Sequence, residues 1–417
     1  FLHEREVIDE SLALSEDRHS LQLLGSGVFV EEGFELYGEE EKNALLELWE
    51  KNGGILFAHG FDAVRKGVYR VREFEKEFAA YVGSAHAQAV TSGSTALLVG
   101  LQALGVKPGD EVITQCHTFV ATAEAIILLG ATPVFTEIDE NLNMCPKDLE
   151  KKITGKTRAI IPVHMSGLVA DMDPILEIAR KNKVPVLEDN AQGMGAFYKG
   201  KSLGTLGDVG TFSFDFGKLL TTGEGGMVVT PHEKVYQEAL AFHDHGHEYN
   251  PSVGRADDTR HAYGFNFRMT ELQGALGLVQ LKKVKNMIAI QRENKKKLKA
   301  YFSALPIKFR KVSDPESDCG DSLVFLMDST GEAEKVVARM KELGVGTKNL
   351  PDALRWHFAG LWEHMLDGKY DIEKAAHEWP ASRELLYRSI ALPISLKMTD
   401  ASIENMAQKV IQAIKGN

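Results

Sequence analysis

The sequence has few cysteines, no long apolar run and no excess of basic side chains. Its three cysteines, Cys116, Cys145 and Cys319, are widely spaced along 417 residues. An odd and sparse set argues against a disulfide framework and favours a reducing compartment. No apolar run approaches the roughly 20 residues that cross a bilayer. Because the chain starts at Phe1 without an apolar signal core, we expect a trimmed, cytoplasmic protein that does not enter a membrane.

The charge balance is acidic, with 48 Lys and Arg against 59 Asp and Glu. Neutralising nucleic-acid phosphates requires clustered basic residues, so we do not expect a nucleic-acid partner. The short basic run at 295–297 is typical of a solvated helix face. The length exceeds what a single hydrophobic core usually serves, which predicts more than one structural unit.

Strand-like and helical patterns alternate along the middle of the chain. Apolar runs of strand length occur at 111–114, 133–135, 159–163 and 185–189, and helical periodicity occurs at 121–129 and 172–182. This alternation predicts an α/β fold with a mostly parallel central sheet. Thr270 is a good N-cap for a long helix reaching about Ile288. We expect an N-terminal arm (1–70), a large domain (71–290) and a smaller C-terminal α+β domain (291–417).

Lys218 lies in an unusual sequence context. An aromatic strand-like run, Phe212–Phe214, precedes it and a glycine-rich turn, Gly223–Gly226, follows it. These flanks predict that the lysine is buried, and burial favours the neutral amine that attacks carbonyls. The alternative is a surface lysine at the end of a hairpin.

Three other stretches carry candidate site residues after strand-like runs. The turn Ser92–Thr95 leads into a helix and predicts an anion site made of helix N–H groups and hydroxyls, or only a serine N-cap. Asp189 ends an apolar strand, where it either caps a turn or faces a positive ring nitrogen. Phe119 is either a core residue or a platform for a planar ring. Since sites in parallel sheets lie at the carboxyl ends of strands, we expect these residues to lie together.

A fourth stretch, His243–His247, contains three histidines and an aspartate. Neither a helical pair of histidines nor a distant third ligand is evident, so we interpret it as a polar loop rather than a metal site. The glycines at 204, 207 and 210 imitate a dinucleotide-binding pattern. We reject that interpretation, because the flanking sequence predicts no preceding strand and no following helix.

Together, an anion site, a stacking aromatic, an aspartate and a lysine are what pyridoxal 5′-phosphate requires. The phosphate needs a helix N-terminus, the ring needs a flat apolar face, and the ring nitrogen needs an anion that keeps it protonated. The aldehyde needs an amine.

In the order and spacing of its motifs, the chain resembles the sugar aminotransferases of the perosamine-synthase type, in the aspartate-aminotransferase superfamily (fold type I). The resemblance runs from about residue 35 to the end of the chain. It is strongest in five motifs, at 91–97, 118–123, 188–192, 212–226 and 264–269.

The resemblance implies a role for each matching residue around the cofactor ring. Lys218 would form the Schiff base with the cofactor and carry protons. Asp189 would pair with the ring nitrogen, and Gln192 would contact the ring hydroxyl. Phe119 would stack on the ring.

The resemblance also implies a phosphate site and a partner. Ser94, Thr95 and Ser213 would hold the phosphate. Asn266 would reach the same phosphate from the neighbouring subunit, which places the site at a homodimer interface.

The family uses L-glutamate as the usual amino donor and a keto sugar as the acceptor. The acceptor would be 8-dehydro-3-deoxy-octulosonate, for lipopolysaccharide or another surface glycan, or a nucleotide-linked 3- or 4-keto hexose. Asp215–Gly217 and Asn190 depart from the common family pattern, and these departures bear on the acceptor. In the branch that dehydrates the sugar a histidine replaces the lysine, so Lys218 argues against that branch. An α-oxoamine synthase and a non-catalytic regulator that binds the cofactor remain as alternatives.

Overall fold

The computed structural model describes residues 33–312, 314–366 and 378–416, so residues 1–32 of the expected N-terminal arm lie outside the described residues. Within these ranges, no helix combines the length and the apolar character needed to cross a membrane.

The central sheet is built from two groups of strands joined in the middle. One group, in the order β3–β2–β4, contains Thr132–Thr136, Glu111–Gln115 and Thr157–Ile161 and is parallel throughout. The other, in the order β5–β8–β9–β1, contains Leu187–Asp189, Val209–Ser213, Gly226–Thr230 and His86–Val90. Parallel bridges from Ile160 to Val186 and from Val163 to Asp189 join β4 to β5.

The strand directions confirm the mostly parallel α/β class. β5 and β8 are parallel, whereas β9 pairs antiparallel with both β8 and β1. β1 therefore points the same way as β8, and β9 runs opposite to its neighbours. The carboxyl ends of β1, β2, β4, β5 and β8 meet at one edge of the sheet.

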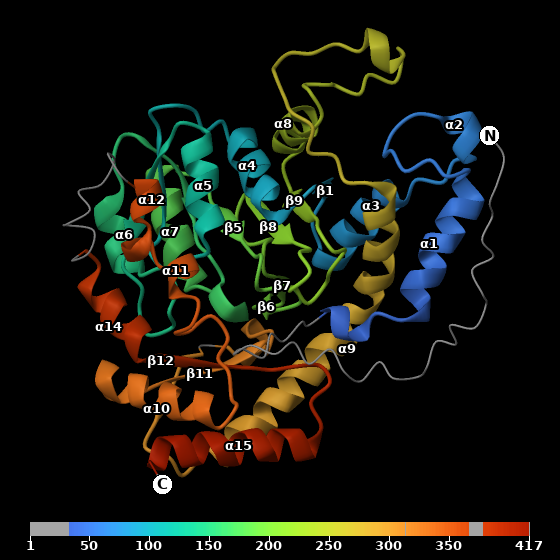
Figure 1. The fold of residues 1–417 in the computed structure, drawn as a ribbon. Coiled ribbons are helices and arrows are strands. Elements are labelled where there is room, and N and C mark those ends of the chain that lie inside the picture. The colour runs from blue at the N-terminus through green and yellow to red at the C-terminus, as the bar shows by residue number, and fades with distance from the viewer. Residues whose placement is uncertain (1–32, 313, 367–377, 417) are drawn as a thin grey trace, which may run out of the picture.

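Helices cover both faces of this sheet (Figure 1). On one face, α3 (Arg70–Val82), α7 (Met172–Asn182) and α9 (Glu271–Tyr301) share a core with Met227 and Val229. On the other, α4 (Gly93–Ala103), α5 (Val120–Leu128) and α8 (Glu233–His243) share a core with Val228. Successive strand residues point to opposite faces, so the apolar run of β9 serves both cores.

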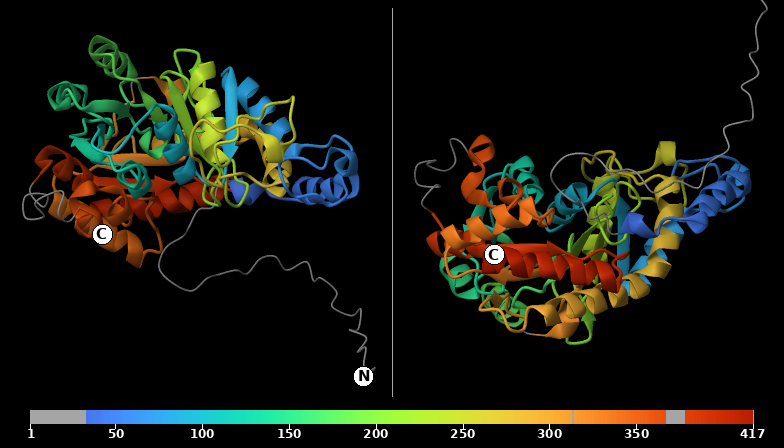
Figure 2. Two further views of the ribbon diagram at one scale, coloured as in Figure 1. Left: turned by 90° about the horizontal axis from the view of Figure 1, so that it is seen from above. Right: turned by 60° about the horizontal axis from the view of Figure 1, so that its bottom comes forward.

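The C-terminal unit has its own sheet and core. In this sheet β10 (Lys308–Phe309), β11 (Ser322–Leu326) and β12 (Ser389–Pro393) pair antiparallel. Helices α10 (Thr330–Glu342) and α15 (Asp400–Lys415) pack on it, next to the end of α9 (Figure 2). The long helix begins after Thr270 as predicted but continues beyond Ile288 to Tyr301, so the proposed domain boundary at 290/291 falls within it.

The remaining elements are short or peripheral, apart from α1 (Glu39–Asn52), which packs on α9. Short helices are η1 (Gly33–Leu36), α2 (Asp62–Arg65), α6 (Pro146–Lys152), η2 (Met165–Gly167), η3 (Arg255–Asp257), η4 (Pro315–Ser317), α11 (Leu354–His357), η5 (Ala359–Leu361) and α12 (Glu363–Leu366). A longer helix, α14 (Pro380–Arg388), precedes β12, and β6 (Phe197–Tyr198) pairs with β7 (Lys201–Ser202).

Candidate active site

Asp189 lies at the carboxyl end of β5 and is fully enclosed by protein. Thr122 Oγ1 on α5 donates a hydrogen bond to Asp189 Oδ2 at 2.8 Å, and the Ala191 N–H donates to Asp189 Oδ1 at 3.1 Å. Burial raises the pKa of this carboxyl, while the two hydrogen bonds and the positive charge of Lys218 oppose the rise. Asp189 thus caps the turn, as one interpretation of the sequence expected, and its pairing with a ring nitrogen stays a prediction.

A buried histidine–glutamate pair next to Asp189 was not predicted from the sequence. The Ala170 N–H donates to His164 Nδ1 at 3.2 Å, so His164 Nε2 carries the proton that is donated to Glu188 Oε2 at 2.9 Å. Glu188 also accepts the backbone N–H groups of residues 204, 206 and 207. The glycine-rich stretch is therefore a loop that wraps a buried carboxylate. The one available signal was a charged residue inside an apolar strand, which must find donors when buried.

The turn before α4 forms as predicted from its serine. Ser92 is the N-cap, and its hydroxyl accepts the Thr95 N–H at 3.1 Å. The Thr95 hydroxyl accepts the Ser92 N–H and donates to the Ser92 carbonyl oxygen. Ser94 lies exposed in the first turn, where helix N–H groups lack partners within the helix. A Cβ on Gly93 would lie 2.6 Å from the Cβ of Ser213, so only glycine lets the end of β8 approach this turn so closely. The geometry brings Ser94, Thr95 and Ser213 together.

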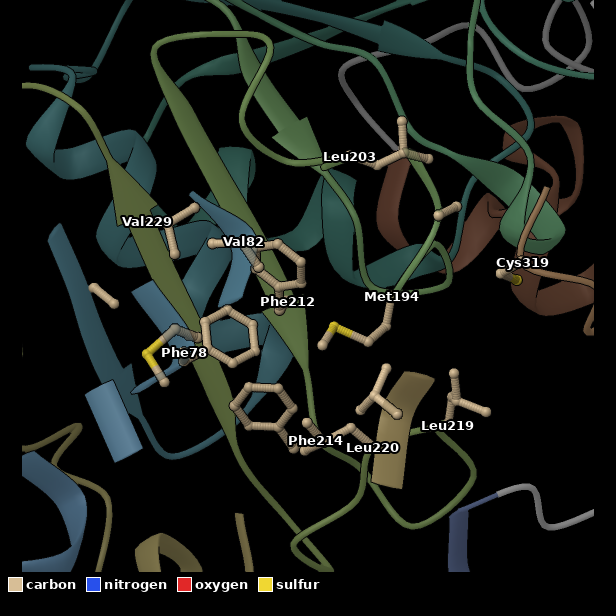
Figure 3. Close-up of a cluster of buried hydrophobic side chains, with 14 of the residues drawn as sticks. Phe78, Val82, Met194, Leu203, Phe212, Phe214, Leu219, Leu220, Val229 and Cys319 are labelled. Atoms are coloured by element: carbon tan, nitrogen blue, oxygen red, sulfur yellow. The ribbon is translucent and has the colours of Figure 1, made fainter. Parts of the chain in front are cut away.

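Lys218 is half-buried, so the predicted burial of this side chain is wrong. Its flanks are buried: Phe212 and Phe214 pack against Phe78, and Leu219 and Leu220 also point into the core (Figure 3). The loop 215–218 itself lies at the surface of this core. Asp215 Oδ1 accepts the Gly217 N–H at 3.0 Å and the Asp215 carbonyl accepts the Lys218 N–H at 3.0 Å, so the departing residues 215–217 shape the lysine turn.

Phe119 is 41% exposed, so it is not a core residue. It lies 6.2 Å from Trp356, ring centroid to ring centroid, with the planes 17° apart, and 5.4 Å from the ring of His357. The Thr118 N–H donates to the His357 carbonyl at 3.0 Å, which ties this distant segment to the end of β2. No local sequence pattern indicates Trp356 or His357, because they reach the site through a contact between remote segments.

His357 stands close to Lys218 in a defined protonation state. His357 Nδ1 donates to the Ala353 carbonyl at 2.9 Å, which leaves Nε2 as the acceptor. Burial, assisted by the charge of Lys218, lowers the pKa of His357 to about 4, so the imidazole is neutral at neutral pH.

Gln192 and Asn266 lie in different surroundings. Gln192 follows Asp189 in the same turn, and its Oε1 accepts the Ser166 N–H at 2.7 Å. Asn266 is exposed on the segment that returns from the protruding loop around η3 (Figure 1), where its backbone bridges to Asp244. The proposed contact of Asn266 with a neighbouring subunit stays a prediction.

The polar loop at 243–247 is organised around Asp244. Arg255 and Arg268 both pair with this carboxylate, and the Tyr249 hydroxyl donates to it. A cavity of about 650 Å³ opens nearby between α3, β1 and α8. His59, Glu75 and His243 are among its lining residues, whereas Lys218 and Asp189 are not, so the cavity is separate from the strand-end site.

The strand-end site fits pyridoxal 5′-phosphate in each of its parts. A buried carboxylate that no arginine or lysine contacts among the described residues suits a cationic ring nitrogen, and a helix N-terminus with hydroxyls suits a phosphate. The exposed ring of Phe119 offers a flat apolar face, and Lys218 offers the amine.

Comparisons with known proteins agree with this geometry. The model of the DegT/DnrJ/EryC1/StrS aminotransferase family matches residues 62–411. The spore coat polysaccharide biosynthesis protein SpsC of Bacillus subtilis is 36% identical over 359 residues, which cover 83% of this chain and 90% of that protein. A GDP-perosamine synthase of Caulobacter vibrioides is 44% identical over 223 residues, 52% of this chain and 57% of the synthase. Among solved structures, an aminotransferase from Psychrobacter cryohalolentis has a TM-score of 0.80 at 28% identity, covering 91% of this chain and 98% of that one.

Proposed function

The chain belongs to the DegT/DnrJ/EryC1/StrS aminotransferase family, and we propose that it moves an amino group from L-glutamate to a keto sugar, using pyridoxal 5′-phosphate as its cofactor. The proposed acceptor is 8-dehydro-3-deoxy-octulosonate, which would yield 8-amino-3,8-dideoxy-octulosonate for lipopolysaccharide or another surface glycan. We further infer a cytoplasmic homodimer in which Asn266 of each subunit reaches the other subunit's site.

One observation carries the proposal. Lys218, from the loop between β8 and β9, lies near enough to Asp189, at the end of β5, for its charge to lower the pKa of that buried carboxyl. An amine beside a carboxylate reserved for a ring cation is the pairing that this cofactor requires.

The residues of the chain would divide the work around the cofactor. The bound cofactor supplies an electron sink for the negative charge left when a C–H bond breaks. Asp189 would pair with the ring nitrogen. Hydrogen bonds from Thr122 and from the Ala191 N–H hold the Asp189 carboxylate in place. Lys218 Nζ would take the proton from the donor carbon and return a proton at the cofactor carbon, acting as the general base and then the general acid. Ser94, Thr95 and Ser213 would bind the phosphate, Phe119 would support the ring, and Gln192 would contact its hydroxyl.

The nature of the acceptor is supported by the lysine loop. Asp215–Gly217 form a turn held by the Asp215 carboxylate, at a position where the resemblance to the sugar aminotransferases implies a different composition. This loop borders the space beside Lys218, so its composition favours an acceptor unlike that of the common members. A nucleotide-linked 3- or 4-keto hexose is the second candidate, favoured by the similarity to the GDP-perosamine synthase.

The test is a single-turnover experiment on the purified protein. The cofactor is first converted with L-glutamate to pyridoxamine 5′-phosphate. The enzyme is then mixed with 8-dehydro-3-deoxy-octulosonate or a GDP-linked 4-keto hexose, and the aldehyde form is separately mixed with an amino acid and a coenzyme A thioester. The absorbance of the aldehyde form should return with the octulosonate. Its return with the hexose alone would identify the hexose as the acceptor, and release of free coenzyme A from the separate mixture would indicate an α-oxoamine synthase. A protein that takes an amine from no donor would be a regulator.

The Lys218→Ala variant tests the catalytic amine. We expect turnover to fall by several orders of magnitude, because the base and the covalent attachment are both lost. Borohydride should fix the cofactor to the wild type but not to the variant, as followed by protein mass. Ordinary turnover by Lys218→Ala would refute the assignment.

A further inference from the structure

The segment before α1 is seated directly on the lysine loop. The Gly33 N–H donates to the carbonyl oxygen of Lys218 at 3.1 Å. A Cβ on Gly33 would lie 2.2 Å from the Leu219 carbonyl oxygen, so only glycine allows this contact. The residues that follow Gly33 are therefore fixed beside the lysine, although they are far from it in sequence.

This contact brings two exposed aromatic rings together. Phe34 and Phe216 are 44% and 38% exposed, and their ring centroids lie 4.8 Å apart with the planes tilted by 44°. Phe216 is two residues before Lys218, and Phe34 follows Gly33. An exposed aromatic pair costs solvation in the free protein, so its place beside the catalytic loop points to a ligand.

The residues that follow Phe34 hold its side of the pair in place. The Tyr37 hydroxyl donates to the Thr221 carbonyl at 2.7 Å, and its ring lies 5.6 Å from Phe34. Glu35 accepts hydrogen bonds from the Ser395 hydroxyl and the Leu396 N–H, at 2.6 and 2.7 Å. A surface fixed in this way loses little conformational entropy when a ligand binds.

The charges nearby restrict which part of a ligand the pair can bind. Asp215 lies in the same turn as Phe216. Burial and then the charge of Asp215 raise the pKa of Glu224, which places the two carboxyl groups close together. Carboxylates repel a diphosphate but accept hydrogen bonds from neutral hydroxyls.

We propose that Phe34 and Phe216 form a wall of the acceptor site that covers the apolar face of the sugar ring and thereby selects the acceptor, an inference that rests on the proposed keto-sugar function. A sugar ring carries C–H groups on its faces and hydroxyls at its edges, so an aromatic face bordered by carboxylates matches it. A nucleobase would also stack on the rings, but its diphosphate would lie near Asp215 and Glu224.

The experiment separates the two half-reactions in Phe34→Ala, Phe216→Ala and the double variant. The glutamate half-reaction should change less than twofold, while the rate constant for 8-dehydro-3-deoxy-octulosonate at low concentration should fall about tenfold in each single variant. The double variant should lose less than the product of the single effects, because both residues contact one ring. Phe216→Tyr, which keeps an aromatic face, should restore the rate.

A binding measurement that requires no turnover accompanies the kinetics. The 8-hydroxy compound 3-deoxy-octulosonate has no carbonyl at the reacting carbon, so it can bind without being aminated. Its dissociation constant, measured by calorimetry, should increase about tenfold in the alanine variants. Tyr301→Ala, which removes a 43% exposed ring at the far end of α9, is the matched control and should leave both measurements unchanged.

Two results would contradict the proposal that Phe34 and Phe216 form a wall of the acceptor site. One is an unchanged acceptor rate in the alanine variants, and the other is an equal loss in the glutamate half-reaction, which would make the pair a support of the lysine loop. If the wild type aminates neither the octulosonate nor the GDP-linked hexose, the result contradicts the proposed keto-sugar function itself, on which the proposed wall rests. Phe216→Leu, which conserves apolar volume, repeats the test if Phe216→Ala does not fold.

Discussion

Two buried aspartates, Asp189 and Asp244, have opposite surroundings. Asp189 ends β5 and receives one hydroxyl and one backbone N–H. Asp244 follows α8, at the end of the helix dipole that disfavours an anion, and it receives two guanidinium groups and a phenol. Both side chains are enclosed by protein, so burial alone does not distinguish them.

The pKa values of the two carboxyls shift in opposite directions. Burial raises the pKa of Asp189, and its hydrogen bonds with the charge of Lys218 offset only part of that rise. Burial would also raise the pKa of Asp244, but the hydrogen bonds from Arg255 and Tyr249 and the charges of Arg255 and Arg268 hold it well below its usual range. The protein neutralises Asp244 with its own cations, whereas Asp189 keeps a raised pKa, as the proposed pairing with the cation of a ligand requires.

The largest effect should follow from Asp189→Asn. We expect turnover to fall on the order of a thousandfold, because the amide cannot keep the ring nitrogen protonated. The cofactor-free variant should be as stable as the wild type or more so at neutral pH, as measured by denaturant unfolding. The reason is that the folded-state pKa of Asp189 is raised, so the wild type loses stability as the pH rises through that pKa. A clear loss of stability in the cofactor-free variant would show that the carboxylate is structural.

Asp244→Asn, in contrast to Asp189→Asn, should lower the unfolding free energy. Two guanidinium groups lose their counter-charge, which should cost about 2–3 kcal/mol of unfolding free energy at neutral pH, since Arg255 remains partly exposed and finds water. The folded-state pKa of Asp244 is lowered. Its contribution to folding stability is therefore present at pH values above the usual aspartate pKa, which is about 4, and is lost as the pH falls. The gap in unfolding free energy between wild type and variant should therefore narrow on acidification. Asp257→Asn, an exposed aspartate of the same loop, is the control, and an Asp244→Asn protein as stable as that control would contradict the interpretation.

The sequence predicts the helix start and the strand end that carry the proposed cofactor residues, because these features follow local rules. Ser92 caps its helix, Asp189 ends its strand, and parallel strands bring both to one edge of the sheet. The resemblance to fold-type-I sugar aminotransferases is confirmed by the family match, and pyridoxal 5′-phosphate is the cofactor of that family.

The other features depend on contacts between distant segments, which no local pattern encodes. Trp356 reaches Phe119 from the C-terminal unit, and Gly33 reaches Lys218 from the start of the described chain. The full burial of Lys218 was predicted wrongly because its apolar neighbours anchor the loop in the core while the lysine itself is only half-buried. The arginine partners of Asp244 follow it by 11 and 24 positions, so the histidines beside it were the more visible but less informative signal.

The smallest effect that sharpens the comparison is expected from Thr122→Val. Thr122 Oγ1 donates to Asp189 Oδ2 and lies 2.7 Å from Thr118 Oγ1. Valine conserves the shape but removes a hydrogen bond that favours the charged carboxylate, so the pKa of Asp189 should rise further. A hydrogen bond to a charged group contributes about 1.5–3 kcal/mol, so cofactor affinity at neutral pH should weaken about tenfold or more.

The pH dependence of cofactor affinity decides whether this loss acts through Asp189. A protonated carboxyl cannot balance the ring cation, so affinity falls as the pH falls through the pKa of Asp189, and raising that pKa moves the fall to higher pH. Titrating cofactor-free Thr122→Val with pyridoxal 5′-phosphate at a series of pH values should show this displacement. Thr118→Val removes a hydroxyl one step further from the carboxylate and should show a smaller one. A uniform loss of affinity at every pH would mean that Thr122 supports the shape of the site rather than the charge of Asp189.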